Sequence, residues 1–295
     1  MQREKHIKSG RLFEAEFYPV FADGRRVPTR APKTKRSTAE QARYNLKKAQ
    51  KNFVRRVNAN FFTGDIYMHP TFEPGVAPFT IEDAKVHIAN FFRRAKRMRA
   101  RALKEVKKAL KISPEDKRLV KLKKKLDEPF RYAYKIESET FKRGARKGQK
   151  RWHFHLFMTG GCSRDDIEEC WGLGSCNADR YQPEKYGPER AALYAAKEDQ
   201  GELKLGYSKN LVAPDDTKVK DGAISASGVE RLAKMRVDDA AFWEKRYKGY
   251  KFLRCYSRFN TYNGYWYVSV VMYKPESEGA LPRWTGTDDW LCEAE

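Results

Sequence analysis

The stretch Arg151–Met158, with the sequence RWHFHLFM, constrains this chain more than any other. Apolar residues alternate there with two histidines, which is typical of a β-strand. Successive side chains of a strand point to opposite faces, so His153 and His155 are expected on one face. The apolar residues then share the other face: Trp152, Phe154 and Leu156. Two imidazoles about 6–7 Å apart form half of a divalent-cation site. The alternative is a strand with an ordinary polar outer face.

The chain is strongly basic. Its 295 residues contain 61 Lys and Arg against 39 Asp and Glu, a formal net charge of +22. Such an excess favours a polyanionic partner, nucleic acid before membrane, because positive charge concentrates phosphate groups near the protein. Aromatic residues, 13% of the chain, could stack on bases. The length allows one large domain or two small ones.

Several classes of protein are disfavoured by missing signals. No apolar run is long enough to span a membrane, and the first residues lack the apolar core of a signal peptide. The five cysteines include no Cys-x-x-Cys pair, which favours reduced thiols and a cytoplasmic location over a disulfide framework. No P-loop motif is present, so no ATPase or helicase is expected in this chain.

The N-terminal half is expected to contain a basic arm followed by basic helices. Residues 1–37 are polar and basic and predict an extended arm, with a short hairpin near Asp23-Gly24. A helix is expected over Ala39–Val57 after a Ser or Thr cap. A second helix begins after Thr80, with Asp83 completing a box-like cap. Its expected apolar side contains Val86, Phe91 and Ala95, and its expected basic side contains Arg93, Arg94, Lys96, Arg97, Arg99 and Arg101.

Residues 100–127 form a basic, helix-like insertion that Ser113-Pro114 interrupts. Two interpretations have equal weight, a solvated helical hairpin and an arm that contacts phosphates. Further on, Tyr132–Glu137 alternates as a strand and is expected to pair with the histidine strand as an antiparallel hairpin. A helix is expected over 229–243, and Asn263-Gly264 predicts a hairpin turn. Residues 276–295 form an irregular tail.

Two further groups suggest chemistry at the histidine strand. Tyr194 and Lys197 are three residues apart on an expected helix, so a phenol and an ammonium would face one direction. A phenol is a poor nucleophile unless its target is polarised, which a metal bound to a phosphate achieves. Glu137 is expected beside the two imidazoles, with Glu139 as the competing carboxylate of the same strand phase. Two histidines and one carboxylate suit Mg²⁺ or Mn²⁺.

With these motifs in this order, the chain resembles the HUH endonucleases, and within them the single-tyrosine rolling-circle replication initiators of bacterial plasmids and related elements. The resemblance covers residues 38–275, which are expected to form one nicking domain that includes the basic insertion around 100–127. It rests on several segments. They are Asn58–Phe61 with Gly64-Asp65, Arg131–Glu137, His153 to His155, Trp171-Gly172 with Gly174, Tyr194–Lys197 and Ser208–Leu211.

The resemblance implies an α+β fold similar to that of RNA-recognition motifs, with a central antiparallel sheet and flanking helices. His153 and His155 are then expected on a middle strand, with the Tyr194 helix across that face. It implies that His153, His155 and Glu137 bind Mn²⁺ or Mg²⁺ and that Tyr194 is the catalytic nucleophile. Lys197 is expected to be the second catalytic residue, whose charge could hold the phosphate or the tyrosinate. The reaction implied is nicking and rejoining of single-stranded origin DNA through a 5′-phosphotyrosine. Host helicase and polymerase would then be partners.

One motif departs from the family pattern. The first motif usually reads like Thr-Leu-Thr-Tyr, but here it is His69-Pro70-Thr71-Phe72. Because proline cannot donate to a central ladder, this strand is expected to end early or to lie at an edge. His69 is either an extra polar group near the metal or a loop histidine. A relaxase, a single-strand transposase and a non-catalytic nucleic-acid-binding protein are the alternative functions.

Overall fold

The computed structural model describes residues 1–21, 39–143, 147–148, 150–183, 189–196 and 204–275. These residues form two compact units. Unit 1 contains 1–21 and 213–275 with 183, 189 and 190, and unit 2 contains the described residues of 39–182 and 191–212. No helix in the described ranges is both long and apolar enough to cross a membrane.

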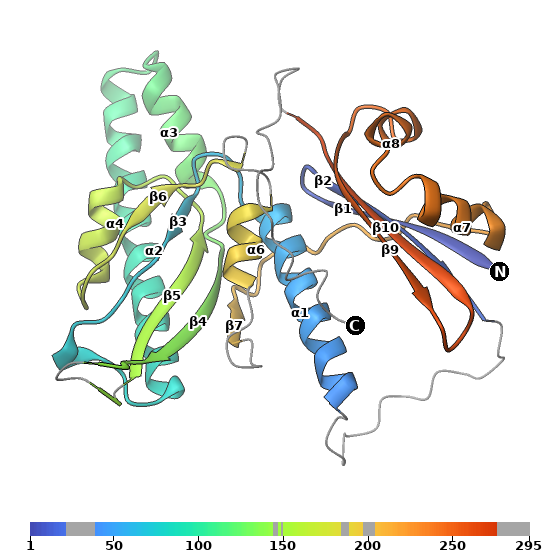
Figure 1. Ribbon diagram of the computed structural model, residues 1–295. Coiled ribbons are helices and arrows are strands. Elements are labelled where there is room, and N and C mark those ends of the chain that lie inside the picture. The colour runs from blue at the N-terminus through green and yellow to red at the C-terminus, as the bar shows by residue number, and fades with distance from the viewer. Residues whose placement is uncertain (22–38, 144–146, 149, 184–188, 197–203, 276–295) are drawn as a thin grey trace. The chain divides into compact units, whose positions relative to one another are not determined.

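Unit 2 is built on a five-stranded antiparallel sheet with the order β6-β3-β5-β4-β7. Its strands are β3 (Ile66–Met68), β4 (Tyr132–Thr140), β5 (Lys150–Met158), β6 (Ala178–Arg180) and β7 (Lys204–Tyr207). The histidine strand β5 is the middle one, as expected (Figure 1). The α+β prediction is confirmed at this level, while its assignment to the HUH class stays a prediction.

The two faces of β5 meet different helices. Trp152, Phe154 and Leu156 are buried in one core with residues of α2 (Ile81–Ile112) and α4 (Arg164–Trp171). On the other face the ring of Phe157 contacts Phe53 of α1 (Ala39–Asn60). Figure 1 accordingly shows α2 and α4 on one side of this sheet and α1 and α6 (Arg190–Ala196) on the other. The expected separation of histidines from apolar residues is confirmed.

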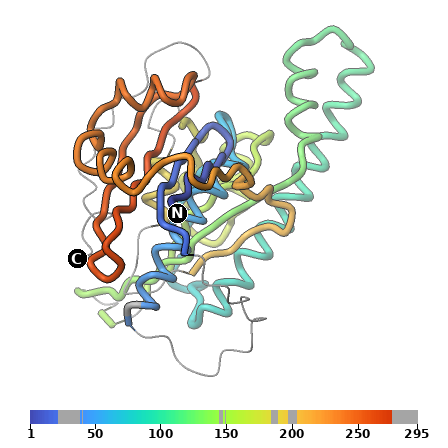
Figure 2. The backbone as a smooth tube through the Cα atoms, turned by 90° about the vertical axis from the view of Figure 1, so that its right-hand side faces the viewer, coloured from blue at the N-terminus to red at the C-terminus, as the bar shows by residue number. Residues whose placement is uncertain are grey.

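Helix α2 begins at the predicted cap, because Thr80 and Asp83 form a reciprocal capping box. Its second half packs against α3 (Lys117–Asp127), and Figure 2 shows the two as a helical hairpin extending beyond the sheet of unit 2. Buried Arg99 fastens this hairpin by donating hydrogen bonds to four main-chain carbonyls, those of Thr159, Lys125, Leu126 and Glu128. The interruption expected at Ser113-Pro114 is therefore the loop between the two helices.

Two residues of α2 lie on the opposite side from the one expected. Val86 is 57% exposed rather than part of the apolar side, and Arg99 is 4% exposed rather than part of the basic side. The helical angle explains Arg99, because it lies one turn from the buried Ala95. Arg99 is tolerated there because carbonyl oxygens satisfy its guanidinium.

Strand β3 ends at Met68, before His69-Pro70, so the predicted early end is confirmed. It does not lie at an edge, because β3 pairs with both β5 and β6. The chain nevertheless stays beside β5: the Phe154 amide donates to the Pro70 carbonyl at 3.1 Å, and Thr71 forms an isolated bridge with His153. Proline therefore removes one donor without changing the register.

Unit 1 contains a second five-stranded sheet, with the order β8-β1-β2-β10-β9. Its strands are β1 (Gln2–Ser9), β2 (Leu12–Pro19), β8 (Val219–Asp221), β9 (Lys251–Asn260) and β10 (Tyr265–Tyr273). Helices α7 (Ala226–Met235) and α8 (Ala240–Arg246) cover one face through a core that includes Phe13, Ala15, Phe17, Val229 and Trp243. The predicted Asn263-Gly264 turn joins β9 to β10, with Gly264 at φ 70°.

This second sheet differs from the expected domain layout. Residues 2–19 form strands rather than a basic arm, because Phe13, Ala15 and Phe17 alternate inward with a period of two. Residues 213–275 pack with these strands, whereas one domain was expected over 38–275. The helix expected over 229–243 is two helices, separated where Asp239 caps α8. The hairpin expected at Asp23-Gly24 and the tail over 276–295 lie outside the described residues.

Candidate metal centre

The register of the β4–β5 hairpin brings Glu137 and both histidines together. Glu137 is the direct cross-strand partner of His153, and Lys135 is the partner of His155. Side chains opposite one another in such a ladder lie about 5 Å apart at Cβ. Glu139 lies two residues after Glu137 on the same strand, where it is opposite Arg151 and exposed. The geometry therefore selects Glu137 over Glu139 as the carboxylate beside the two imidazoles.

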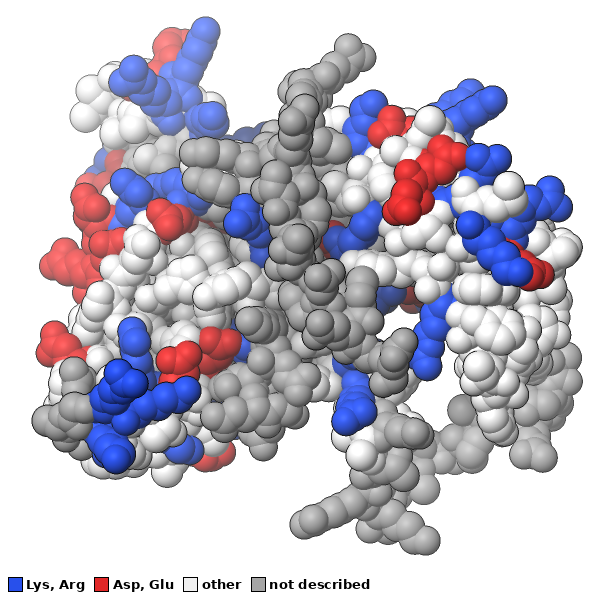
Figure 3. Space-filling view, in the orientation of Figure 1, with Lys and Arg blue, Asp and Glu red and all other residues white. Residues whose placement is uncertain are grey.

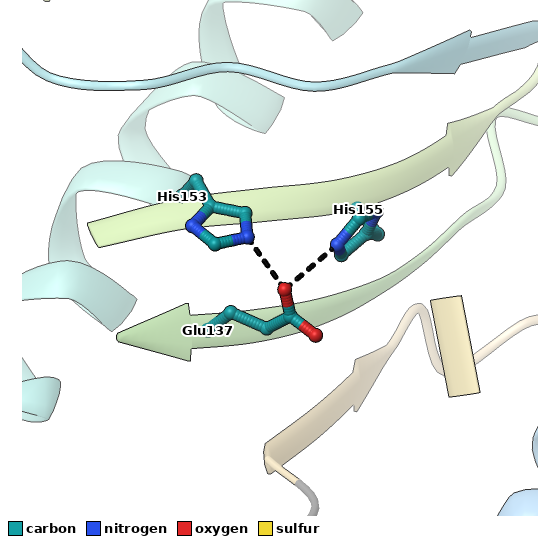
Figure 4. Close-up of side chains that lie close together, drawn as sticks. All are labelled: Glu137, His153 and His155. Carbon is teal, nitrogen blue, oxygen red and sulfur yellow. Dashed lines mark hydrogen bonds and ion pairs between the residues drawn. The ribbon is translucent and has the colours of Figure 1, made fainter. Parts of the chain in front are cut away.

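The three side chains converge on one point (Figure 4). His153 Nε2 lies 2.5 Å and His155 Nε2 lies 3.0 Å from the same Glu137 oxygen, Oε2. One potential ligand atom from each residue lies within 4.8 Å of the other two. Three donors that each lie about 2.1 Å from one ion are roughly 3–4 Å apart. The donor set therefore fits a divalent cation that takes the place of the hydrogen bonds between these groups.

Charge and burial favour the protonation states that a metal requires. Burial acts to raise the pKa of Glu137, but hydrogen bonds from His153, His155 and Lys135 outweigh it and lower that pKa well below its usual range. Burial lowers the pKa of His155, although the Glu137 carboxylate opposes this. Glu137 is therefore a carboxylate at neutral pH. The lowered pKa of His155 favours its neutral imidazole, which is the form that binds metals.

Lys135 is fully buried and points to the same face as Glu137, with which it forms an ion pair. It contacts Oε1, the carboxylate oxygen that the histidines do not. A buried ammonium is tolerated only when it is paired. Lys135 therefore fixes the orientation of the Glu137 carboxylate and leaves Oε2 directed at the two imidazoles.

A tyrosine and a third histidine adjoin His155. The Tyr67 hydroxyl lies 2.8 Å from His69 Nε2 and 3.4 Å from His155 Nδ1. Burial, together with the nearby His155 and His153, lowers the pKa of His69 to about 4, so this imidazole is neutral at neutral pH. His69 is thus a polar group beside the candidate metal centre, which was one of its two interpretations.

Tyr194 lies over the same face. Its ring centroid is 5.2 Å from that of His155 and 6.4 Å from that of His69, in edge-on arrangements. Its side chain is 58% exposed, whereas its neighbours Leu193 and Ala195 in α6 are buried and hold the helix in place. Lys197 lies outside the described residues, so the structure describes one of the two predicted catalytic residues.

Comparisons of the chain with protein-family models, curated proteins and solved structures find no match. The resemblance to HUH endonucleases therefore stays a prediction.

Sequence reasoning missed two members of the site, Tyr67 and Lys135. Both had a usable signal. In the short strand Ile66–Met68 the first and last residues are apolar and lie in the core of unit 2. Alternation along the strand therefore directs Tyr67, between them, to the histidine face. Lys135 has the same strand phase as Glu137, two residues away. Only the register between β3, β4 and β5 shows that both reach the same two histidines.

Proposed function

We propose that this protein is a metal-dependent endonuclease that nicks and rejoins single-stranded DNA at an origin and thereby initiates rolling-circle replication. One juxtaposition carries the proposal. A cation-binding set formed by Glu137, His153 and His155 lies beneath an exposed tyrosine, Tyr194, whose ring is 5.2 Å from that of His155. A nucleophile beside a metal-binding set is the arrangement that phosphodiester transesterification requires.

In the proposed reaction the Tyr194 hydroxyl oxygen attacks the scissile phosphorus. A Tyr194–phosphate ester bond forms and the bond from phosphorus to the 3′ oxygen breaks. The phenolic proton is lost and the 3′ oxygen gains a proton, so the products are a 5′-phosphotyrosine and a free 3′-hydroxyl. The covalent link retains the bond energy, and the reverse step rejoins the strand without ATP.

Glu137, His153 and His155 would hold Mn²⁺ or Mg²⁺. When bound, the cation supplies Lewis-acid polarisation of the phosphate and orients it. The remaining residues position these ligands: Lys135 holds Oε1 of Glu137, and Tyr67 contacts Nδ1 of His155, the nitrogen that faces away from Glu137. Lys197, three residues after Tyr194, is proposed to neutralise charge on the phosphate or on the tyrosinate.

The wider role follows from the chemistry. A free 3′-hydroxyl primes synthesis, so host polymerase and helicase are the proposed partners. The net charge of +22 supports a DNA substrate. Relaxases and single-strand transposases use the same transesterification on other DNA substrates.

The test is a nicking assay on a random-sequence pool of single-stranded DNA labelled at the 3′ end, with Mn²⁺ present. We expect the wild-type protein to form a labelled covalent adduct and Tyr194→Phe to form none. Tyr262→Phe, which alters a tyrosine of unit 1 that is 97% exposed, is the matched control and should retain the wild-type yield. Equal adduct from wild type and Tyr194→Phe would refute the role of Tyr194, and adduct from neither would favour a non-catalytic binding protein.

A further inference from the structure

A row of positive side chains follows the outer surface of α2. Its members are exposed and recur at alternating spacings of four and three residues: Arg97, Arg101, Lys104, Lys108 and Lys111. Such spacing keeps side chains on one side of a helix. At a rise of 1.5 Å per residue, the row is about 21 Å long. We call these five residues the α2 stripe.

The stripe lies directly opposite the buried side of the helix. The inward residues Phe91, Ala95, Arg99 and Val106 are 0–7% exposed and pack in the core of unit 2 or bond to it. Arg99 shows that position, rather than residue type, decides which cations face solvent. The stripe is therefore a surface that folding of the unit does not use.

Most of the stripe has no acidic partner. Lys108 pairs with Glu105 at 2.9 Å. Arg97, Arg101, Lys104 and Lys111 form no ion pair with any described residue. In Figure 3 several Lys and Arg side chains, with acidic and uncharged atoms among them, are visible at the end of the α2–α3 hairpin, at the upper left. Unpaired cations in a row create a positive potential along the helix that attracts a polyanion.

The stripe cannot act on the phosphate at the candidate metal centre. Helix α2 packs on the face of β5 that carries Trp152 and Phe154, whereas His153, His155 and Glu137 occupy the opposite face. The stripe lies on the side of α2 that faces away from this sheet, and its residues 104–111 belong to the hairpin that extends beyond the sheet. Any nucleic acid on the stripe is therefore a segment other than the one at the metal centre.

The composition of the stripe indicates which form of nucleic acid it fits. Surfaces that bind single strands combine positive charge with aromatic side chains that stack on bases. No aromatic residue occurs between Arg97 and Lys111. Duplex DNA exposes phosphates with one negative charge per about 1.7 Å of axis, so a stripe of this length faces roughly a dozen of them. Charge without stacking groups suits the duplex backbone.

We propose that the α2 stripe is a second DNA-binding surface, which holds the phosphate backbone of duplex DNA without regard to sequence. It would hold duplex next to the single-stranded segment that is cut on the other face of the sheet. The inference rests on the proposed function only in the choice of DNA as the polyanion.

The experiment measures how binding to random-sequence duplex DNA depends on salt. The test variant is Arg101→Gln, Lys104→Gln and Lys111→Gln combined, since glutamine has a helix propensity close to those of Lys and Arg. Each lost phosphate contact lowers the slope of log K against log salt by about 0.9, so the slope should fall by about 2.7. Circular dichroism and the thermal midpoint should be unchanged, because the three side chains are exposed.

The matched control removes three exposed lysines that each have a carboxylate partner: Lys85→Gln, Lys234→Gln and Lys251→Gln. It should lower the slope by less than about one. Equal slopes for both triple variants, no change in either, or tighter binding of duplex RNA than of duplex DNA would each overturn the proposal.

A separate arm compares nicking of short single-stranded DNA. The α2 triple variant should cut it at the wild-type rate, and a large loss would contradict the separation of the two surfaces. If the wild-type protein does not nick at all, the proposed function fails while the duplex-binding comparison still decides the role of the stripe.

Discussion

Glu137 and His153 are direct cross-strand partners in the β4–β5 ladder, with His153 Nε2 only 2.5 Å from Glu137 Oε2. This pairing places the carboxylate beside the imidazoles by main-chain register rather than by a mobile side chain. A ladder register is held by many hydrogen bonds at once, and a one-residue slip would move Glu137 to the other face. The candidate metal centre is therefore formed by the fold itself.

The pairing predicts which carboxylate binds metal. Glu137→Gln should lower Mn²⁺ affinity by about 100-fold or more, because it removes one of three ligands and the negative charge. Glu139→Gln is the control, since Glu139 lies opposite Arg151 and not opposite a histidine. The Mn²⁺ affinity of this variant should stay within about twofold of wild type. Titration calorimetry with Mn²⁺ measures both. A larger loss from Glu139→Gln than from Glu137→Gln would refute the ligand assignment.

Tyr67 is predicted to orient His155. If His155 binds a cation through Nε2, the proton of the neutral ring lies on Nδ1 and can be donated to the Tyr67 oxygen. Tyr67 can then donate its own proton to His69 Nε2, 2.8 Å away. Tyr67→Phe should therefore weaken Mn²⁺ binding by roughly 10- to 100-fold. The folded structure should persist, because Phe keeps the ring that stacks on Phe157. Unchanged affinity would show that this hydroxyl does not support the ligand.

The fold of unit 2 near the site was largely predictable, whereas in unit 1 the β9–β10 turn was predicted and the β1–β2 strands were not. The alternation of apolar and polar residues in RWHFHLFM and in Tyr132–Glu137 is enough to predict that these strands pair, because each has one apolar face. The β1–β2 strands were missed because their charged residues hide the same alternation. The pairing of β2 with β10 joins segments about 250 residues apart, which no local pattern reveals.

Within the site, the residues predicted from motifs were those on the histidine strand and its neighbour, together with Tyr194 of α6. The contributions of Tyr67, His69 and Lys135 depend on where three strands place their side chains in register. Because of Pro70 this strand was expected to end early or to lie at an edge. Strand β3 does end at Met68, yet Thr71 bridges to His153 in the same register. A single missing donor is local, whereas the register is set by the surrounding pairs.

Gly174 is predicted to be required for the stability of unit 2, because its Cα lies close to the main chain of residues 71–73. Its φ is 147°, and an added Cβ would lie 2.5 Å from the Glu73 amide nitrogen and 2.8 Å from the Thr71 carbonyl oxygen. Both neighbours are main chain and cannot move aside cheaply. Gly174→Ala should destabilise unit 2 by roughly 2–3 kcal/mol, through strain and overpacking. Gly75→Ala, where a Cβ meets nothing within 4 Å, should have little effect in the same thermal-unfolding experiment. Equal midpoints for both variants would contradict this.

Unit 1 is predicted to lose stability in acid through Glu4. Burial acts to raise the pKa of this carboxyl, but hydrogen bonds from His6 and Tyr247 and the charge of Arg246 lower it overall. A lowered folded-state pKa stabilises the fold above the unfolded value of about 4.3, and this contribution disappears as pH falls further.

Glu4→Gln should therefore destabilise the protein by roughly 2–3 kcal/mol at neutral pH, and the difference from wild type should shrink toward about pH 3. Urea unfolding followed by circular dichroism at several pH values measures this. Glu230→Gln, which breaks an exposed pair with Lys234 at 2.7 Å, is the control and should change little. A difference that is constant with pH would show that the Glu4 charge does not contribute.

The most direct test of the account is to locate the DNA on the protein after reaction with single-stranded DNA and Mn²⁺. Digestion of the adduct and tandem mass spectrometry identify the modified residue. We predict a nucleotide joined by a 5′-phosphate to Tyr194, and none when Glu137→Gln replaces the wild-type protein. DNA attached to any other residue, or an adduct at Tyr194 that forms equally well in Glu137→Gln, would contradict the proposed metal-dependent tyrosine chemistry.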